Sequence, residues 1–236
     1  MADPDPDALS LRDVRFGWPG TGFTLSVPGL RVARGERVLL LGASGSGKST
    51  LLSLICGINA AATGQVVVDG TDLGPLRAAA RDRFRAERIG VIFQMFNLLP
   101  HASALDNVLL PLRFAPIRRV RAGDARMAAL GLTRALGLPD GLVTRGPAGA
   151  LSVGQQQRVA VARALIGAPP LIVADEPTSA LDAGAQGAFL DLMFAQLADA
   201  GSSLLLVSHD DRIGARFDRV LALSDIAQTV QAGAAA

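Results

Sequence analysis

Tyrosine, cysteine and long apolar runs are missing or scarce in this sequence of 236 residues. The single cysteine, Cys56, excludes a disulfide within the chain, as is usual for proteins of a reducing compartment. It follows the apolar helical pattern of residues 51–55, so we expect a buried structural thiol. No run of about 18 apolar residues occurs, which argues against a membrane span. The acidic, proline-rich start lacks the pattern of a secretory signal, so we expect the chain to stay in the cytosol.

Lysine is almost absent. Lys48 is the only lysine among 23 Lys and Arg residues, which indicates a site where a compact ammonium fits and a planar guanidinium does not. The formal net charge is only +2, and no basic block is long enough to form a nucleic-acid-binding tail. The arginines gather weakly in residues 77–88 and 113–126, which we interpret as solvated helix faces. We therefore expect no nucleic acid as a partner.

The remaining composition is that of one compact domain. Half of the residues (50%) are hydrophobic, and the length suits one α/β domain rather than two catalytic domains. Strand-like runs alternate with helical patterns, which predicts a mostly parallel sheet with helices on both faces. The expected strands are residues 9–14, 23–27, 38–41, 65–68, 90–93, 171–174, 204–207 and 220–223. Residues from about 95 to 166 read as an inserted helical subdomain, between a β subdomain interleaved with the core (about 9–70) and the rest of the core (167–225).

A glycine-rich loop follows the expected strand at residues 38–41. Its sequence, Gly42-Ala-Ser-Gly-Ser-Gly-Lys48-Ser49-Thr50, matches the phosphate-binding pattern of Gly, four residues and Gly-Lys-Ser/Thr. Glycines let the backbone N–H groups converge on phosphate oxygens, and the following helix adds positive potential. We expect Lys48 to contact the outer phosphates of ATP and Ser49 to hold Mg²⁺. The other nucleotide-binding candidates in this loop are Gly42, Ser44, Gly45, Gly47 and Thr50.

Two adjacent carboxylates end the apolar run of residues 171–174. Neighbouring strand residues point to opposite sides, so Asp175 and Glu176 should have different roles. Asp175 suits Mg²⁺, directly or through water. Glu176 suits a general base that activates the attacking water.

Further motifs in a fixed order resemble those of ABC ATPases. Leu151-Ser-Val-Gly-Gln155 resembles the signature motif, Asp175-Glu-Pro-Thr-Ser-Ala-Leu-Asp182 the acidic strand and D-loop, Gln94 the Q-loop, and His209 the switch histidine. The resemblance covers nearly the whole chain. It implies a RecA-like phosphate-loop core, an antiparallel β subdomain, a helical subdomain, and a head-to-tail dimer that holds two ATP molecules between its subunits.

The same resemblance implies residue roles. His209 and Gln94 would join Glu176 as catalytic groups near the γ-phosphate and the attacking water, with Gln94 also near the metal. Ser152 and Gly154 begin a helix, so they form a second anion site that the dimer offers to the partner subunit's ATP. Further nucleotide contacts are expected from Gln155 and Asp182. The other histidine, His101, we interpret as a surface residue.

Two positions depart from the family pattern. Val153 stands where the signature motif usually has glycine, while the two phosphate-facing residues beside it remain. A tyrosine usually stacks on the adenine, and this chain has none. The matching place falls on Trp18, with Phe16 as the alternative, although alternation with Val14 points Phe16 into the core. Trp18 could also simply cover the β subdomain as a turn aromatic.

The segment from Arg88 to Leu112 indicates which group of ABC ATPases the chain resembles most. It is similar to ATPases of the lipoprotein-releasing, macrolide-efflux and cell-division systems. This similarity implies a permease with few membrane spans and a peripheral position on the cytoplasmic face of the membrane. We expect the segment from Gln94 to about Leu112 to dock on the permease through its apolar residues Met95, Phe96, Leu98 and Leu99, although these residues can instead pack inside the helical subdomain. An importer ATPase and an ABC ATPase acting on nucleic acid or ribosomes remain as alternatives.

Overall fold

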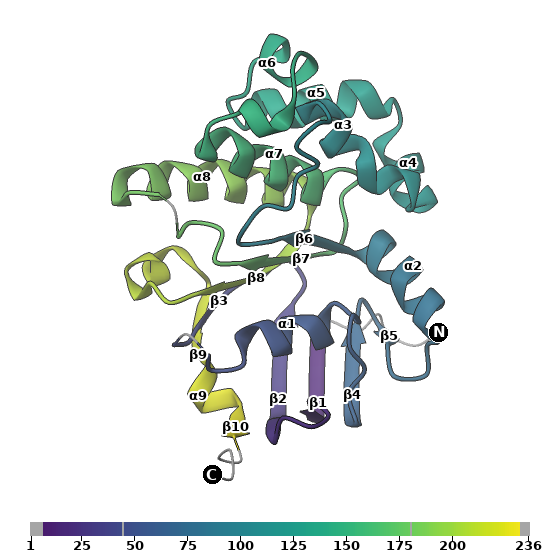
Figure 1. Ribbon diagram of the computed structural model, residues 1–236, viewed down its shortest axis with the longest axis vertical. Helices are drawn as coiled ribbons and strands as arrows, with labels where there is room; N and C mark the ends of the chain where they lie inside the picture. The colour runs from purple at the N-terminus through teal and green to yellow at the C-terminus, as the bar shows by residue number, and fades with distance from the viewer. Residues whose placement is uncertain (1–6, 44, 180, 232–236) are drawn as a thin grey trace.

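Two five-stranded sheets and a layer of helices make up the molecule (Figure 1). The structure is a computed structural model that describes residues 7–43, 45–179 and 181–231. Ser44, expected in the phosphate loop, lies outside the described residues. Among those described, no helix is both long and apolar enough to cross a membrane.

The central sheet is entirely parallel and carries the strands that lead to the expected site. Its order is β6-β7-β8-β3-β9. Along β3, Leu39 packs into the core on one face, and Val38 and Leu40 pack into the core on the other. This explains why the strand is a continuous apolar run, as a sheet covered on both faces requires. The bounds are β3 Arg37–Leu41, β6 Ile89–Ile92, β7 Leu171–Asp175, β8 Ser203–Ser208 and β9 Arg219–Ala222.

The second sheet is antiparallel, with the order β10-β2-β1-β4-β5. Helix α1, Lys48–Ile55, packs between the two sheets through Leu51 and Ile55, both fully buried. The last strand, β10, comes from the far end of the chain and was not expected from the sequence. The bounds are β1 Asp7–Gly17, β2 Phe23–Ala33, β4 Thr63–Val68, β5 Thr71–Asp72 and β10 Gln228–Gln231.

The stretch expected to be helical forms a separate layer at the top of Figure 1. Its core is the buried face of α7, where Val159, Ala160 and Ala162 are fully buried. The helices of this layer are α3 Ala104–Leu109, α4 Pro116–Ala122, α5 Ala125–Ala135, α6 Asp140–Thr144 and α7 Val153–Leu165, with short 3-10 turns at Leu110–Arg113 and Ala148–Ala150. The remaining elements are α2 Ala78–Arg88, α8 Ala183–Ala200, α9 Leu223–Ile226 and a 3-10 turn at Asp211–Arg216.

One arginine contradicts the interpretation of residues 113–126 as a solvated face. Arg118 is only 2% exposed and donates to the carbonyl oxygens of Ala164 and Ile166 at the end of α7. The carboxylate of Glu87 accepts from the backbone N–H of Arg118 at 3.1 Å. Burial lowers the pKa of Arg118 to about 10, which still leaves it charged at neutral pH. Arg118 therefore joins α4 to the core from within.

Cys56 is confirmed as a buried thiol. It is 2% exposed and packs in the core between α1 and the antiparallel sheet. Burial raises its pKa to about 12, so the thiol stays protonated and unreactive in the folded chain.

Candidate active site

The phosphate loop joins the end of β3 to the start of α1. Gly45 and Gly47 adopt φ values of 76° and 99°, in the left-handed region that side chains disfavour. A Cβ on Gly47 would lie 3.1 Å from the Thr229 Cγ2 atom of β10, so this loop also needs glycine for space. The sequence pattern thus corresponds to a curled backbone at the start of a helix, as an anion site requires.

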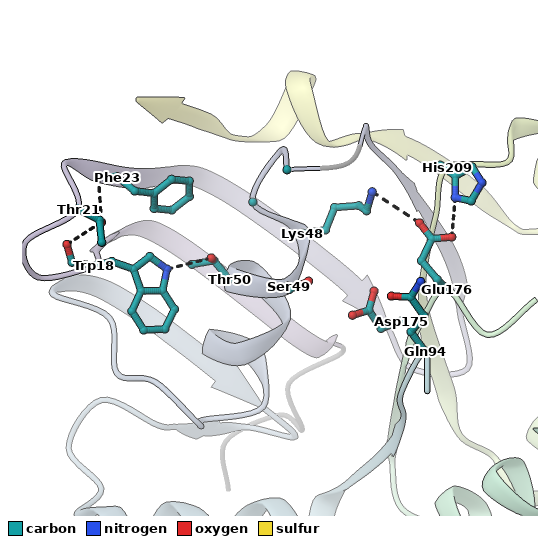
Figure 2. A pocket seen from close by; sticks show the side chains of 12 residues that line it. Trp18, Thr21, Phe23, Lys48, Ser49, Thr50, Gln94, Asp175, Glu176 and His209 are labelled. Carbon is teal, nitrogen blue, oxygen red and sulfur yellow. Dashed lines mark hydrogen bonds and ion pairs between the residues drawn. The ribbon is translucent and has the colours of Figure 1, made fainter. Parts of the chain in front are cut away.

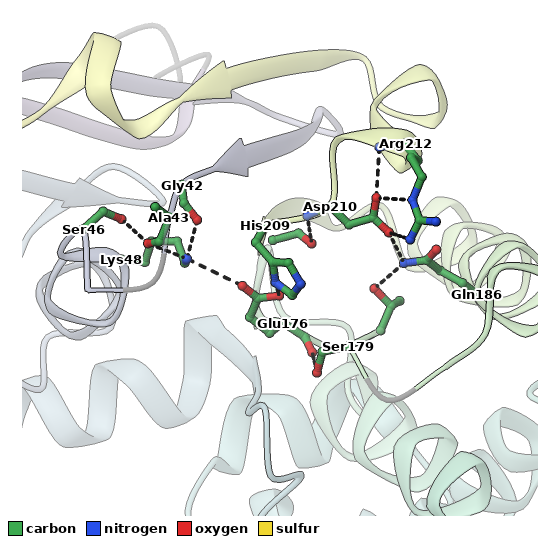
Figure 3. Close-up of polar contacts among 12 residues, drawn as sticks. Gly42, Ala43, Ser46, Lys48, Glu176, Ser179, Gln186, His209, Asp210 and Arg212 are labelled. Carbon is green, nitrogen blue, oxygen red and sulfur yellow. Dashed lines mark hydrogen bonds and ion pairs between the residues drawn. The ribbon is translucent and has the colours of Figure 1, made fainter.

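The Lys48 ammonium bonds to its own loop. Its Nζ atom donates to the carbonyl oxygens of Gly42 at 2.5 Å and Ala43 at 3.0 Å. It also lies 3.6 Å from Glu176 Oε1 (Figures 2 and 3). The side chain is buried, and a compact ammonium with three donors suits these three acceptors. This geometry accounts for a lysine at the one position where the chain does not use arginine.

A cavity of about 720 Å³ collects most of the expected site residues (Figure 2). The phosphate loop and α1 form one side, and the ends of β6, β7 and β8 form the other. Expected residues that line it are Trp18, Gly45, Gly47, Lys48, Ser49, Thr50, Gln94, Asp175, Glu176 and His209. Thr21 and Phe23 line it as well, and the sequence alone did not single them out.

The two carboxylates diverge, but not by strand alternation. Asp175 is the last residue of β7, whereas Glu176 follows the strand with φ 48°, in the left-handed region. Its N–H donates to the Val207 carbonyl at 2.9 Å, which holds this strained turn against β8. Burial, with a smaller contribution from the Glu176 charge, raises the pKa of Asp175. The separate roles of the two acids stay a prediction, and the backbone difference between them comes from this turn rather than from strand alternation.

His209, after β8, and Gln94, after β6, reach the same cavity from the two strands that flank β7. His209 Nδ1 lies 2.8 Å from Glu176 Oε2, and its side chain is 63% exposed (Figure 3). Gln94 is exposed and follows β6. The other histidine, His101, is exposed on the surface, as the sequence indicated.

The oxygen groups of the cavity fit a hard cation such as Mg²⁺. Ser49 and Asp175 offer a hydroxyl and a carboxylate, and Gln94 adds an amide oxygen. A cation here would favour the charged form of Asp175, which burial disfavours. No group of three His, Cys, Asp or Glu side chains forms a ready-made cage in the described part of the chain, which suits a metal held largely by phosphates and water.

The family model described as ABC transporter matches residues 25–179, a stretch that includes the phosphate loop, Gln94, the signature segment and both carboxylates. The chain belongs to the ABC transporter family. It is an ATP-binding, ATP-hydrolysing subunit of this family, and the fold agrees.

Curated relatives include several transport ATPases. The lipoprotein-releasing system ATP-binding protein LolD of Syntrophotalea carbinolica is 39% identical over 201 residues, 85% of this chain and 86% of LolD. The uncharacterized ABC transporter ATP-binding protein YbbA of Escherichia coli K12 is 42% identical over 194 residues, 82% of this chain and 83% of YbbA. The macrolide export ATP-binding/permease protein MacB of Shigella flexneri is 38% identical over 220 residues, 92% of this chain and 33% of MacB.

Solved structures agree with this family. A dimeric ATP-binding cassette in a post-hydrolysis state, bound to ADP and Pi, matches with a TM-score of 0.75 and 31% identity. The match covers 91% of this ABC subunit and 93% of that chain.

Two aromatic rings of this ABC ATPase meet at the mouth of the cavity. Trp18 is 41% exposed, lines the cavity and donates from Nε1 to Thr50 Oγ1 at 3.2 Å. Phe16 packs half-buried against the core of the antiparallel sheet and meets Trp18 edge to face at 5.0 Å. Of the two candidates for adenine stacking, Trp18 lines the cavity and Phe16 does not.

The signature residues of this ABC ATPase lie outside its own cavity. Ser152 is the N-cap of α7, where its hydroxyl accepts from Gln155 N–H at 3.3 Å and Gln155 Oε1 accepts from Ser152 N–H at 3.0 Å. Val153 is 52% exposed, so its side chain needs no room inside the subunit. Asp182 likewise caps a helix, α8, through Ala185 N–H at 2.9 Å. The cavity lining includes none of Ser152, Gly154, Gln155 and Asp182, and Gly42 borders a different hollow beside α9.

The apolar segment after Gln94 divides into buried and exposed residues. Phe96 is 8% exposed and Leu98 packs against the helical core, so the expectation that these two side chains face a partner is wrong. Met95 and Leu99, at 81% and 49%, are the exposed ones. Phe96 and Asn97 adopt positive φ values, so the backbone turns sharply at the point where the buried and exposed residues part.

Proposed function

We propose that two copies of this subunit close head to tail around two ATP molecules and drive a separate membrane permease. The observation that carries the proposal is the one-sided cavity. It contains the phosphate loop and the catalytic carboxylate, whereas the anion-binding helix start at Ser152 and Gly154 lies elsewhere on the surface. A second copy can supply this missing wall. The dimeric cassette with ADP and Pi supports the same arrangement.

The chemistry we propose is in-line attack of water on the γ-phosphorus. Glu176 accepts a proton from the water as its oxygen bonds to phosphorus, and the bond from phosphorus to the β–γ bridging oxygen breaks, releasing ADP. Lys48 exchanges its loop carbonyls for phosphate oxygens. Ser49 and Asp175 would hold Mg²⁺, which would supply neutralisation of the phosphate charge. His209 holds the Glu176 carboxylate in position relative to the γ-phosphate.

Adenine binding belongs to the antiparallel sheet in this proposal. The exposed ring of Trp18 stacks on the base, which is worth about 1–3 kcal/mol for such contacts. Its N–H to Thr50 fixes the ring next to the phosphate loop. The absence of tyrosine is then compensated by one tryptophan at the mouth of the cavity.

A second hollow supports the permease as partner. It has a volume of about 720 Å³ and lies between α2, the β6 strand and the segment before α4. Its wall includes Val91 and Phe93, which lead directly to Gln94 in the ATP site. An apolar groove one residue from a catalytic group suits a short helix of a partner that must respond to ATP. Further apolar lining residues are Ile58, Ile89, Leu110, Pro111 and Phe114, and the charged residues Asp82, Arg83, Arg85, Arg118 and Arg163 line the hollow as well.

The relatives favour outward transport. LolD belongs to a lipoprotein-releasing system and MacB to macrolide export by their names. We therefore propose that the complex exports a substrate or transmits mechanical force across the cell envelope. Its permease would hold this subunit peripherally on the cytoplasmic face of the membrane.

The test combines capture and coupling. Membranes of the source cell are mixed with the tagged subunit, and the captured permease is identified by mass spectrometry and reconstituted. Phe114→Asp, at a residue that lines the apolar groove and is 65% exposed, should leave ATP binding by the isolated subunit intact and abolish the change in ATPase rate caused by the permease, because a charge in an apolar contact is costly. Met127→Asp, at an exposed position on α5 away from the groove, is the matched control. Normal coupling in Phe114→Asp would place the docking site elsewhere.

A further inference from the structure

A buried glutamine ties together the two segments that carry the hydrolytic residues. Gln186 lies in the first turn of α8 and is 6% exposed. Its Nε2 atom lies 3.0 Å from Thr178 Oγ1 and 3.2 Å from Asp210 Oδ2 (Figure 3). Thr178 is two residues after Glu176, and Asp210 is the residue after His209. One amide group thus bridges the chain just beyond both members of the Glu176–His209 pair.

The chemistry of the acceptors decides which end of the amide faces them. The Arg212 guanidinium donates to both carboxylate oxygens of Asp210 at 2.8 Å, and these bonds hold the pKa of Asp210 below its usual range. Asp210 is therefore ionised at neutral pH and can only accept. The amide nitrogen of Gln186, with two N–H groups, matches this carboxylate and the Thr178 hydroxyl together.

The two segments need a tie because the sheet ends before them. Strands β7 and β8 pair in parallel as far as Asp175 and Val207, and the Glu176 N–H still bonds to the Val207 carbonyl, but this ladder does not reach Thr178 or Asp210. The His209 side chain is 63% exposed, which leaves little packing to fix it. Its 2.8 Å contact with Glu176 depends on where the two backbone segments lie. A bridge between Thr178 and Asp210 sets that separation.

We propose that Gln186 is a positioning residue that holds His209 and Glu176 in register for ATP hydrolysis. It touches neither the nucleotide cavity nor the two side chains, and acts through Thr178 and Asp210. The inference rests on the hydrolytic roles proposed above for Glu176 and His209. Because Gln186 lies one turn after Asp182 at the start of α8, a shift of that helix end moves the bridge as well.

The experiment measures ATPase kinetics of the isolated subunit. Gln186→Met removes the amide at similar length, and Thr178→Val removes its hydroxyl partner without leaving a polar atom behind. Each should lower kcat by about three- to tenfold, with the KM for ATP within about twofold, because binding groups are untouched. The double variant should be no slower than the slower single variant, since both changes delete one bridge. Gln65→Met, at an exposed site of β4, is the matched control.

The outcomes separate this inference from the proposed function. Normal kcat in folded Gln186→Met, a change in KM alone, or multiplicative losses in the double variant would each overturn it. If Gln186→Met does not fold, the kcat of Thr178→Val tests the inference instead, and a normal kcat in that variant would overturn it. Glu176→Gln and His209→Ala are measured alongside. If these two keep normal activity, the proposed chemistry fails; if they lose activity while the bridge variants do not, only the positioning role of Gln186 fails.

Discussion

Replacing Glu176 by glutamine tests the proposed chemistry most directly. The carboxylate is 8% exposed, lies 3.6 Å from the Lys48 ammonium and 2.8 Å from His209. Glutamine keeps the size of the side chain and one oxygen, and removes the charge and the proton acceptor. The change should therefore separate ATP binding from ATP hydrolysis.

Two magnitudes follow. Loss of a general base lowers kcat by about 10²–10⁴-fold, which is about 3–5 kcal/mol of barrier. Two unit charges 3.6 Å apart attract by about 4–5 kcal/mol at an effective dielectric of about 20. Desolvation of the Lys48–Glu176 pair offsets most of this, and a remainder of about 1 kcal/mol must be given up when Lys48 turns to phosphate. Glu176→Gln removes this remaining attraction, so the variant should bind ATP about fivefold more tightly than the parent.

The assay has three parts: phosphate release, calorimetric titration with ATP and Mg²⁺, and size-exclusion chromatography with light scattering. Glu176→Gln should release almost no phosphate, bind ATP more tightly and elute as a dimer at saturating ATP. Asp82→Asn, an exposed carboxylate on α2, controls for the loss of one charge. A kcat within about tenfold of the parent would refute the base assignment, and a monomer at saturating ATP would refute the shared site.

Three further outcomes are expected. Lys48→Ala and Lys48→Arg should both abolish ATP binding in a calorimetric titration while the circular dichroism spectrum stays unchanged, because the loop accommodates only the compact ammonium. Cys56 should resist a thiol reagent at pH 8 and react only in guanidinium; since burial raises its folded pKa from 9.0 to about 12, stability should be full below about pH 9 and decrease as pH rises from there. Arg118→Ala should lower the free energy of unfolding by about 3–5 kcal/mol in a denaturant titration, whereas Arg119→Ala, at an exposed neighbour, should change it little.

The residues on the catalytic side of the cavity could be predicted from the sequence because each of their motifs is a short, contiguous pattern. A phosphate loop needs glycines and a lysine at fixed spacing after a buried strand, so Gly45, Gly47 and Lys48 could be placed from residue order alone. Asp175 and Glu176 follow a run of apolar residues that only a doubly covered strand explains. The apolar pattern of α1 likewise predicted that Cys56 is buried.

Features that depend on distant partners could not be found this way. The local sequence around β10 does not predict its pairing with β2, because the two strands lie almost the whole chain apart. In the sequence Arg118 does not differ from its exposed neighbours, because only the tertiary contact with the carbonyl oxygens at the end of α7 distinguishes it. Phe96 and Met95 have the same apolar character, and a turn with positive φ decides which of them is buried. Gln186 gains its partners only when two strand ends and α8 come together.

The pairing of β10 with β2 places Thr229 beside the phosphate loop. Thr229 of β10 and Phe23 of β2 both lie next to Gly47, and Phe23 also lines the cavity. Any ligand that tightens the phosphate loop should therefore slow hydrogen–deuterium exchange of the backbone amides in Gln228–Gln231. The same coupling means that a truncation before Gln228 opens the edge of β2 and loosens the wall behind the phosphates. An affinity tag fused close behind this strand would act on the ATP site, even though more than 170 residues separate the two in sequence.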